Sequence, residues 1–190
     1  AVVPDSKGAV GSVVDSILQG GPQKIGTELI FRAYPSLLND LGVSDPRLSQ
    51  LFGAGHFDQR WLGSTLTVPL FMARGVEQGP QLRTDLHCEP IGNAMLMLSG
   101  SKRWMLMPAS ESHLLEPTIS PDGRAYFVSS LPPDVPQFAS TAVRYHVETS
   151  TGDLLWVPPW TWHRVDYVPK VVAASASLFH FRLQQAMSTL

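Results

Sequence analysis

Residues 144–182 read RYHVETSTGDLLWVPPWTWHRVDYVPKVVAASASLFHFR. This stretch holds short apolar or alternating runs at 144–148, 153–157, 163–168 and 171–182, with the turn-forming pairs Gly-Asp and Pro-Lys between them. Such runs, bounded by turn residues, are typical of β-strands. Similar runs occur earlier, at 66–73, 83–89, 93–98 and 103–107. Eight short strands without helical patterns between them predict a mainly β fold, either a β-sandwich or a jelly roll.

The first third of the chain has a different pattern. The apolar residues of Val10–Leu18 recur at helical spacing, and residues 34–52 could hold two short helices. We therefore expect an N-terminal helical support segment over 1–60, a β core over 61–182 and a tail over 183–190. Within the core, the Pro- and Ser-rich stretch 116–141 lacks a clear period and is predicted to be a long, functional insert.

The composition excludes several classes of protein. The 190 residues include 14 basic and 16 acidic side chains, and a net charge of −2 argues against a non-specific nucleic-acid binder. The apolar runs are too short to span a bilayer. Cys88 is the only cysteine, so no internal disulfide can form. We expect a soluble domain, intracellular or organellar, whose exact compartment the sequence does not reveal.

Three His-x-acid pairs occur in the chain. On a strand, such a pair places both side chains on one face, and two imidazoles with one carboxylate form the ligand set of non-haem iron sites. The pair His56–Asp58 follows a Gly-Ala-Gly loop, and His146–Glu148 fits an ordinary structural strand. The pair His87–Glu89 stands out because polar residues surround it at useful spacings, namely Thr84, Asn93 and Lys102, with His163 as a distant imidazole.

Three segments carry a family resemblance. They are Thr-Asp-Leu-His-Cys-Glu-Pro at 84–90, Gly-Ser-Lys-Arg-Trp-Met-Leu-Met-Pro at 100–108 and Gly-Asp-Leu-Leu-Trp-Val-Pro-Pro-Trp-Thr-Trp-His at 152–163. They resemble the JmjC and cupin-like 2-oxoglutarate- and Fe(II)-dependent oxygenases, and are most similar to the small protein-hydroxylase (asparaginyl hydroxylase-like) branch. The resemblance runs from about residue 61 to 181 and implies a double-stranded β-helix, which is the cupin-like jelly roll.

The resemblance also implies a set of site residues. It assigns the iron ligands to His87, Glu89 and His163, with no catalytic residue beyond them. It assigns cosubstrate binding to Lys102, which would hold the distal carboxylate of 2-oxoglutarate, to Thr84, which would share that carboxylate, and to Asn93 beside them. Two features depart from the hydroxylase branch. Glu89 replaces its usual aspartate and is common instead in histone-demethylase branches, and the helices that dimerise the asparaginyl hydroxylase are absent after 182, so that route to a dimer is not expected.

The resulting expectation is an Fe(II)- and 2-oxoglutarate-dependent dioxygenase that hydroxylates a protein or peptide side chain. Two alternatives stay open. One is a catalytically silent structural or assembly subunit of a larger complex, because fold does not determine function. The other is a metallo-cupin that does not use 2-oxoglutarate. The sequence leaves open the substrate, and whether the reaction is hydroxylation or demethylation.

Overall fold

The computed structural model describes residues 10–21, 24–41, 66–121, 123–131, 142–181 and 187. The helices within these ranges are α1 (Val10–Leu18), α2 (Leu29–Ala33), α3 (Ser36–Asp40) and the 3-10 helix η2 (Ala109–Leu114). The strands are β1 (Lys24–Thr27), β2 (Leu66–Thr67), β3 (Leu70–Arg74), β4 (His87–Cys88), β5 (Gly92–Ser99), β6 (Ser101–Met107), β7 (Pro117–Ile119), β8 (Phe127–Ser129), β9 (Tyr145–Ser150), β10 (Leu154–Val157), β11 (Trp162–Tyr167) and β12 (Val172–His180).

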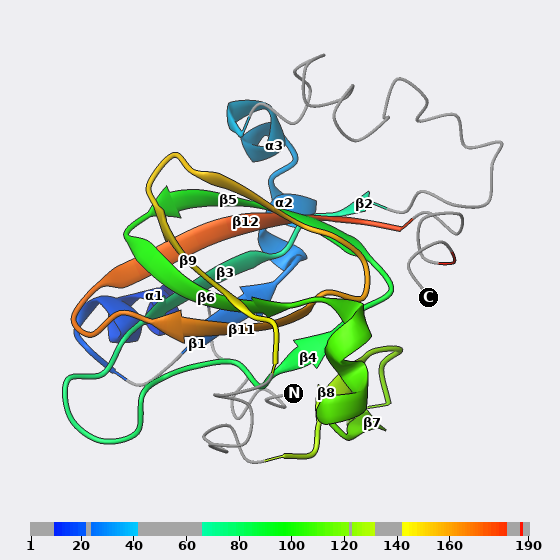
Figure 1. The fold of residues 1–190 in the computed structure, drawn as a ribbon. Coiled ribbons are helices and arrows are strands. Elements are labelled where there is room, and N and C mark those ends of the chain that lie inside the picture. The colour runs from blue at the N-terminus through cyan, green and yellow to red at the C-terminus, as the bar shows by residue number, and fades with distance from the viewer. Residues whose placement is uncertain are drawn as a thin grey trace, which may run out of the picture.

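In the described part of the chain the strands form two six-stranded sheets. One has the order β1-β3-β12-β5-β10, with β2 also paired to β12, and the other has the order β7-β8-β4-β11-β6-β9. The pairings between these named strands are antiparallel, and neighbours in a sheet are mostly distant in the chain. Figure 1 shows the long strands of the two sheets stacked across one another. The predicted mainly β, cupin-like jelly roll is therefore confirmed.

The main core lies between the two sheets. The side-chain period of two aims alternate residues of each strand toward the facing sheet. On β6 and β11, for example, Trp104 lies opposite Val165 and both are buried. Both sheets contribute to the buried cluster, which consists of Ala73, Met95, Met97, Trp104, Val157, Val165, Tyr167 and Ala173. Polar residues that lie two positions from a core residue on the same strand therefore also point into this interior.

The N-terminal segment is only partly helical. The predicted helix at Val10–Leu18 is present as α1, and it buries Ile17 against Ile25 and Met72 on one sheet (Figure 1). Helix α3 falls within the predicted 34–52 region, whose remainder from 42 onward lies outside the described residues. Strand β1 and helix α2 were not predicted. Strand β1 is four residues long and includes a glycine, so its pairing to β3 rather than its own pattern defines it.

The predicted insert 116–141 is not irregular throughout. Strands β7 and β8 form a hairpin, and β8 pairs with β4, so that Val128 lies opposite His87. Residues 122 and 132–141 of this stretch lie outside the described part. The hairpin escaped prediction because its strands have three residues each, too few to show a period. Its pairing places part of the insert beside the proposed iron ligands.

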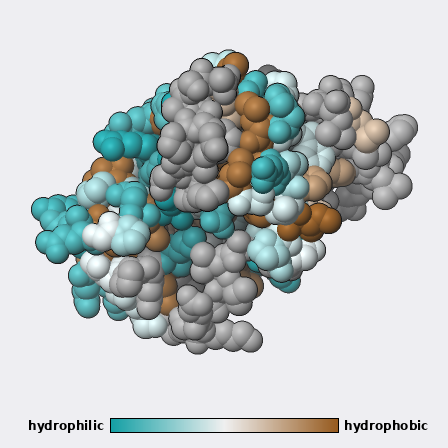
Figure 2. Space-filling model, turned by 60° about the horizontal axis from the view of Figure 1, so that its bottom comes forward, coloured by the Kyte–Doolittle hydropathy of each residue, from teal (hydrophilic) through white to brown (hydrophobic). Residues whose placement is uncertain are grey.

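The described residues include no candidate membrane-spanning helix, and one face of their surface is shown in Figure 2. No helix among them has the length and apolarity needed to cross a membrane. Figure 2 shows the face that lies at the bottom of Figure 1. On the described part of this face, hydrophobic residues form small separate groups among hydrophilic ones.

Candidate metal centre

Two histidines from different parts of the chain meet on the inner face of one sheet. His87 on β4 and His163 on β11 are register partners, and their ring centroids are 4.2 Å apart. His163 is buried and alternates with Val165 and Tyr167 of the core. Because β4 is only two residues long, its pairing with β11 positions His87 directly across from its partner.

In both imidazole rings, Nδ1 is hydrogen-bonded to a backbone carbonyl and Nε2 is left free. The Nδ1 atom of His87 lies 2.7 Å from the carbonyl oxygen of Asp85, and that of His163 lies 3.0 Å from the carbonyl oxygen of Thr161. A carbonyl oxygen only accepts, so each Nδ1 carries the proton and donates. Each Nε2 then keeps its lone pair, as in metal-ligating histidines whose other nitrogen bonds a backbone carbonyl. Burial, followed by the repulsion between the two rings, lowers the pKa of His87 to about 3, so this imidazole is neutral at physiological pH.

Glu89 is the predicted carboxylate ligand of the same region. It follows His87 by two residues and interacts electrostatically with His163, and burial raises the pKa of its carboxyl group. Its backbone carbonyl accepts a hydrogen bond of 2.7 Å from the N–H of Trp160. Across the described residues, however, no three His, Cys, Asp or Glu side chains group closely enough to hold a metal ion. The structure thus brings the two imidazoles together, and leaves the carboxylate near them without completing a three-ligand group.

Lys102 is a buried cation on the neighbouring strand β6. Its side chain is 2% exposed, and Nζ donates a hydrogen bond of 2.5 Å to Oγ of Ser175 on β12. The ammonium lies 5.4 Å from the ring centroid of Tyr167 and 5.9 Å from that of Phe71. Burial lowers the pKa of Lys102 to about 7. Since no carboxylate in the described ranges pairs with this ammonium, the site has one positive group without a balancing charge.

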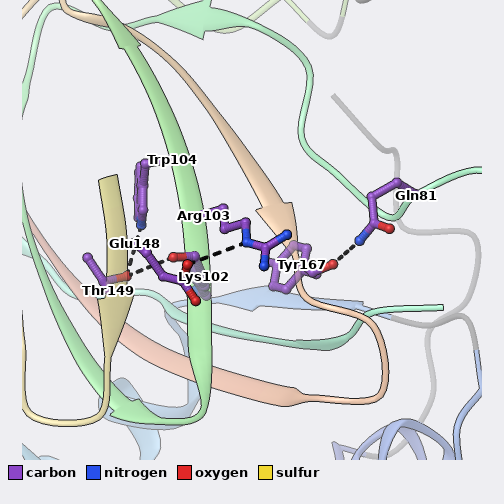
Figure 3. Close-up of polar contacts among 7 residues, drawn as sticks. All are labelled: Gln81, Lys102, Arg103, Trp104, Glu148, Thr149 and Tyr167. Carbon is purple, nitrogen blue, oxygen red and sulfur yellow. Dashed lines mark hydrogen bonds and ion pairs between the residues drawn. The ribbon is translucent and has the colours of Figure 1, made fainter. Parts of the chain in front are cut away.

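A small hydrogen-bond network supports the strand that carries Lys102. Thr149 on β9 donates from Oγ1 to the Lys102 carbonyl oxygen at 3.3 Å and accepts from Nε1 of Trp104 at 3.2 Å (Figure 3). The ring of Trp104 in turn lies 6.1 Å from that of His163. On the other side of β11, the side-chain amide of Gln81 donates to the carbonyl oxygen of Tyr167 (Figure 3). These bonds fix the backbone between the two histidines and the lysine.

The remaining predicted site residues, Thr84 and Asn93, have different environments. Thr84 accepts a hydrogen bond of 2.9 Å from the N–H of Val165 through its Oγ1, so its hydroxyl proton is still available to a ligand. Asn93 is 5% exposed on β5, where it alternates with the inward-facing Met95 and Met97. In the described structure, Oδ1 of Asn93 has no hydrogen-bond partner. A buried acceptor without a donor is costly and is often satisfied by a ligand or water.

Two neighbours of the site were missed from the sequence. The first is Ser175. Serines alternate with alanine at 175–177 of a long apolar strand, and this pattern could have indicated a polar group on the inner face. The second is Tyr126, which precedes β8, with its ring centroid 5.8 Å from that of His87 in an edge-on contact. No signal marked Tyr126, because only the pairing of β8 with β4 brings it there.

The other two His-x-acid pairs have different outcomes. His146 and Glu148 are exposed on the edge strand β9, and Glu148 forms an ion pair of 3.5 Å with Arg103 (Figure 3). This agrees with a structural strand. His56 and Asp58 lie outside the described residues. Cys88 is buried on the face opposite His87, packed with Leu86, and burial raises the pKa of its thiol to about 12.

Two facing antiparallel sheets with inward-pointing histidines define a cupin-like jelly roll. The family model described as "Cupin-like domain" matches residues 26–181, and the chain belongs to this family. HSPB1-associated protein 1 from Homo sapiens and from Bos taurus is similar to the chain, each 33% identical over 98 residues. These matches cover 48% of the chain but only 20% of the length of each relative.

Solved structures of two enzymes show a distant likeness. An oxalate oxidase matches with a TM-score of 0.40 and 11% identity, over 61% of this chain and 42% of its own. Hydroquinone 1,2-dioxygenase from Sphingomonas sp. TTNP3 matches with a TM-score of 0.39 and 12% identity, over 60% of this chain and 59% of its own. Similarity at this level carries no information about the reaction or its substrate.

Proposed function

We propose that this domain is an Fe(II)- and 2-oxoglutarate-dependent dioxygenase. The observation that carries the proposal is the pair of inward imidazoles, His87 and His163, lying in the same interior as the unpaired ammonium of Lys102. Imidazoles whose Nδ1 atoms are bound to backbone carbonyls present Nε2 to a divalent metal ion. A buried ammonium without a carboxylate suits an acidic ligand, because burying an unpaired charge is costly.

The two absent groups have candidate ligands among the residues present. His87, His163 and Glu89 would hold iron(II), and the hydrogen bonds of the two Nδ1 atoms keep the imidazoles oriented toward it. Glu89 would complete the set from two residues after His87, where it interacts electrostatically with His163. Iron(II) with 2-oxoglutarate and dioxygen supplies the chemistry when bound, in which decarboxylation of the 2-oxo acid drives hydroxylation of a C–H bond.

The chain itself supplies binding and exclusion of water. Lys102 would bind the distal carboxylate of the cosubstrate, with Thr84 as a hydroxyl donor. Asn93, whose Oδ1 is unpartnered among the described residues, would hydrogen-bond beside the metal and cosubstrate. The core around these groups, including Trp104 and Tyr167, would keep water from the reacting centre.

A protein or peptide side chain is the proposed substrate, on resemblance to the asparaginyl hydroxylase-like branch. The hairpin β7–β8 supports this because it places Tyr126 beside His87, on a part of the chain suited to substrate recognition. The name of the relatives, HSPB1-associated protein 1, describes association with another protein, which is compatible with a protein partner. Glu89, in place of aspartate, keeps the demethylase branch as an alternative.

One observation favours a second candidate, a structural or assembly subunit without activity. Among the described residues, Glu89 does not form a three-ligand group with the histidines. A domain that had lost its metal would retain the jelly roll and the buried lysine. A metallo-cupin that does not use 2-oxoglutarate is a third candidate, although it supplies no acidic ligand for the ammonium of Lys102.

A thermal-shift experiment separates these candidates. Ligands that bind only the folded state raise the melting temperature. The oxygenase is expected to melt higher with Mn(II), and higher again when 2-oxoglutarate is added with the metal. No joint shift would favour the structural subunit. Conversion of 2-oxoglutarate to succinate with Fe(II) and dioxygen would contradict the metallo-cupin, and a metal response without a 2-oxoglutarate response would support it.

A further inference from the structure

The partner of Lys102 inside the protein is a serine that the family motifs do not include. Nζ of Lys102 on β6 and Oγ of Ser175 on β12 are 2.5 Å apart, and this bond joins the two facing sheets. Ser175 is 0% exposed. Thr84, the hydroxyl expected to act with Lys102, accepts a hydrogen bond from the backbone N–H of Val165 and makes none with Lys102.

The hydrogen-bond roles leave Ser175 with an unused donor. Lys102 has only donors, so Oγ of Ser175 must accept in this bond. Within the described part of the chain, the Ser175 side chain makes no other hydrogen bond, so its hydroxyl proton is free. The ammonium keeps two further N–H donors. A carboxylate has two oxygens and could therefore accept from both groups at once.

An irregularity in strand pairing occurs next to Ser175. The pairing of β12 with β5 shifts register between Ala174 and Ser175, where Ser175 lies opposite Met97. Irregularities of this kind re-aim side chains and are common beside active sites. The rings of Phe71 and Tyr167 flank the ammonium, so the polar pair Lys102–Ser175 is enclosed by apolar groups.

We infer that Ser175 is a cosubstrate-binding residue, which together with Lys102 holds the distal carboxylate of the 2-oxo dicarboxylic acid. This inference rests on the proposed function. The Ser175 hydroxyl donates to one carboxylate oxygen and Lys102 donates to the carboxylate as well. Before the acid arrives, Ser175 holds the ammonium in place and offsets part of its burial.

Ser177 provides a matched control. It lies two residues further along β12, is also buried, and points to the same interior by the period of two, but it makes no hydrogen bond with Lys102. An effect of losing any buried hydroxyl from this strand should therefore appear equally in Ser175→Ala and Ser177→Ala. An effect on the carboxylate should appear only in Ser175→Ala.

The test is calorimetric titration of 2-oxoglutarate into protein saturated with Mn(II) and without dioxygen, for the wild type and both variants. A hydrogen bond to a charged group predicts that Ser175→Ala weakens 2-oxoglutarate binding about tenfold. Its affinity for Mn(II), measured separately, should stay within about twofold of the wild type, and so should both affinities of Ser177→Ala. Ser175→Cys, which replaces the hydroxyl by a weak donor of similar size, is used in the same way if Ser175→Ala does not fold.

The outcomes separate the inference from the proposed function. A wild-type protein that binds Mn(II) and 2-oxoglutarate, with a Ser175 variant that binds 2-oxoglutarate equally well, overturns the role of Ser175 alone. So does an equal loss in the Ser177 control, or a parallel loss of Mn(II) affinity. A wild-type protein that binds no 2-oxoglutarate overturns the proposed function, and the role of Ser175 with it.

Discussion

His163 lies directly opposite His87 across the pairing of β11 with β4, with the two ring centroids 4.2 Å apart. Each ring directs Nδ1 to a backbone carbonyl two residues before it in the chain. The same local arrangement thus occurs on both strands and leaves both Nε2 atoms free. A metal ion bound here would crosslink two strands that are distant in sequence.

Substitution of the proposed ligands should remove metal stabilisation. We expect His87→Ala and His163→Ala to lose the increase in melting temperature produced by Mn(II), because each removes an imidazole ligand. The matched control is His146→Ala, since His146 belongs to another His-x-acid pair but is exposed on β9. The control should keep the full Mn(II) shift in the same thermal-melt assay. Retention of the shift in both ligand variants would place the metal elsewhere.

Lys102→Met should stabilise the ligand-free protein while abolishing its response to 2-oxoglutarate. Burial lowers the pKa of Lys102 from 10.5 to about 7, so the folded state binds fewer protons than the unfolded state between these values. The wild-type free energy of unfolding therefore rises with pH from about 7 to 10.5, and the lysine destabilises the fold below pH 7. Lys102→Met removes this penalty, which is roughly 4–5 kcal/mol at pH 6 because each pKa unit corresponds to about 1.4 kcal/mol.

Urea unfolding at pH 6 and at pH 9 measures the predicted change in stability. The difference in stability between Lys102→Met and the wild type should shrink as pH rises through the window. Thermal melts with Mn(II) should still show a metal shift in the variant, with no further shift from 2-oxoglutarate. A variant that is less stable than the wild type at pH 6 would show that the ammonium has a compensating partner.

Thr149→Val tests the network behind Lys102. The substitution keeps the side-chain shape but leaves the buried N–H of Trp104 without its acceptor and removes the bond to the Lys102 carbonyl oxygen. We expect a loss of about 1–3 kcal/mol in the free energy of unfolding. Thr151→Val is the control, because Thr151 is exposed and bonds the Gly100 carbonyl oxygen only at 3.4 Å. Urea unfolding should show a change within about 0.5 kcal/mol for the control.

Gly100→Ala should destabilise the turn between β5 and β6. Gly100 has a φ of +74°, and a Cβ there would lie 2.2 Å from the carbonyl oxygen of Val172. Gly152 also has a positive φ, of +92°, but a Cβ would meet nothing within 4 Å. Gly152→Ala should therefore cost about 1 kcal/mol for backbone strain alone, and Gly100→Ala clearly more because the backbone must also move. Equal losses in chemical unfolding would show that the close approach to Val172 relaxes freely.

Local pattern was sufficient for much of the fold and part of the site. The alternation of apolar residues predicted most of the longer strands, and helical spacing predicted α1. The period of two also put Cys88 on the opposite face from His87, and it allowed Lys102 to point inward, where the structure buries it. These properties depend only on residues that are neighbours along the chain, so the sequence is enough to predict them.

Strand pairing decided the rest, because a period defines which face a residue occupies but not which strand lies beside it. The four residues of β1 and the three-residue strands β7 and β8 become strands only through partners elsewhere. The contact of Tyr126 with His87, and the bond between Lys102 and Ser175, each join segments that no local pattern connects. Hydrogen bonding between distant backbones and burial between facing sheets are properties of the folded chain, so its three-dimensional arrangement was needed to reveal them.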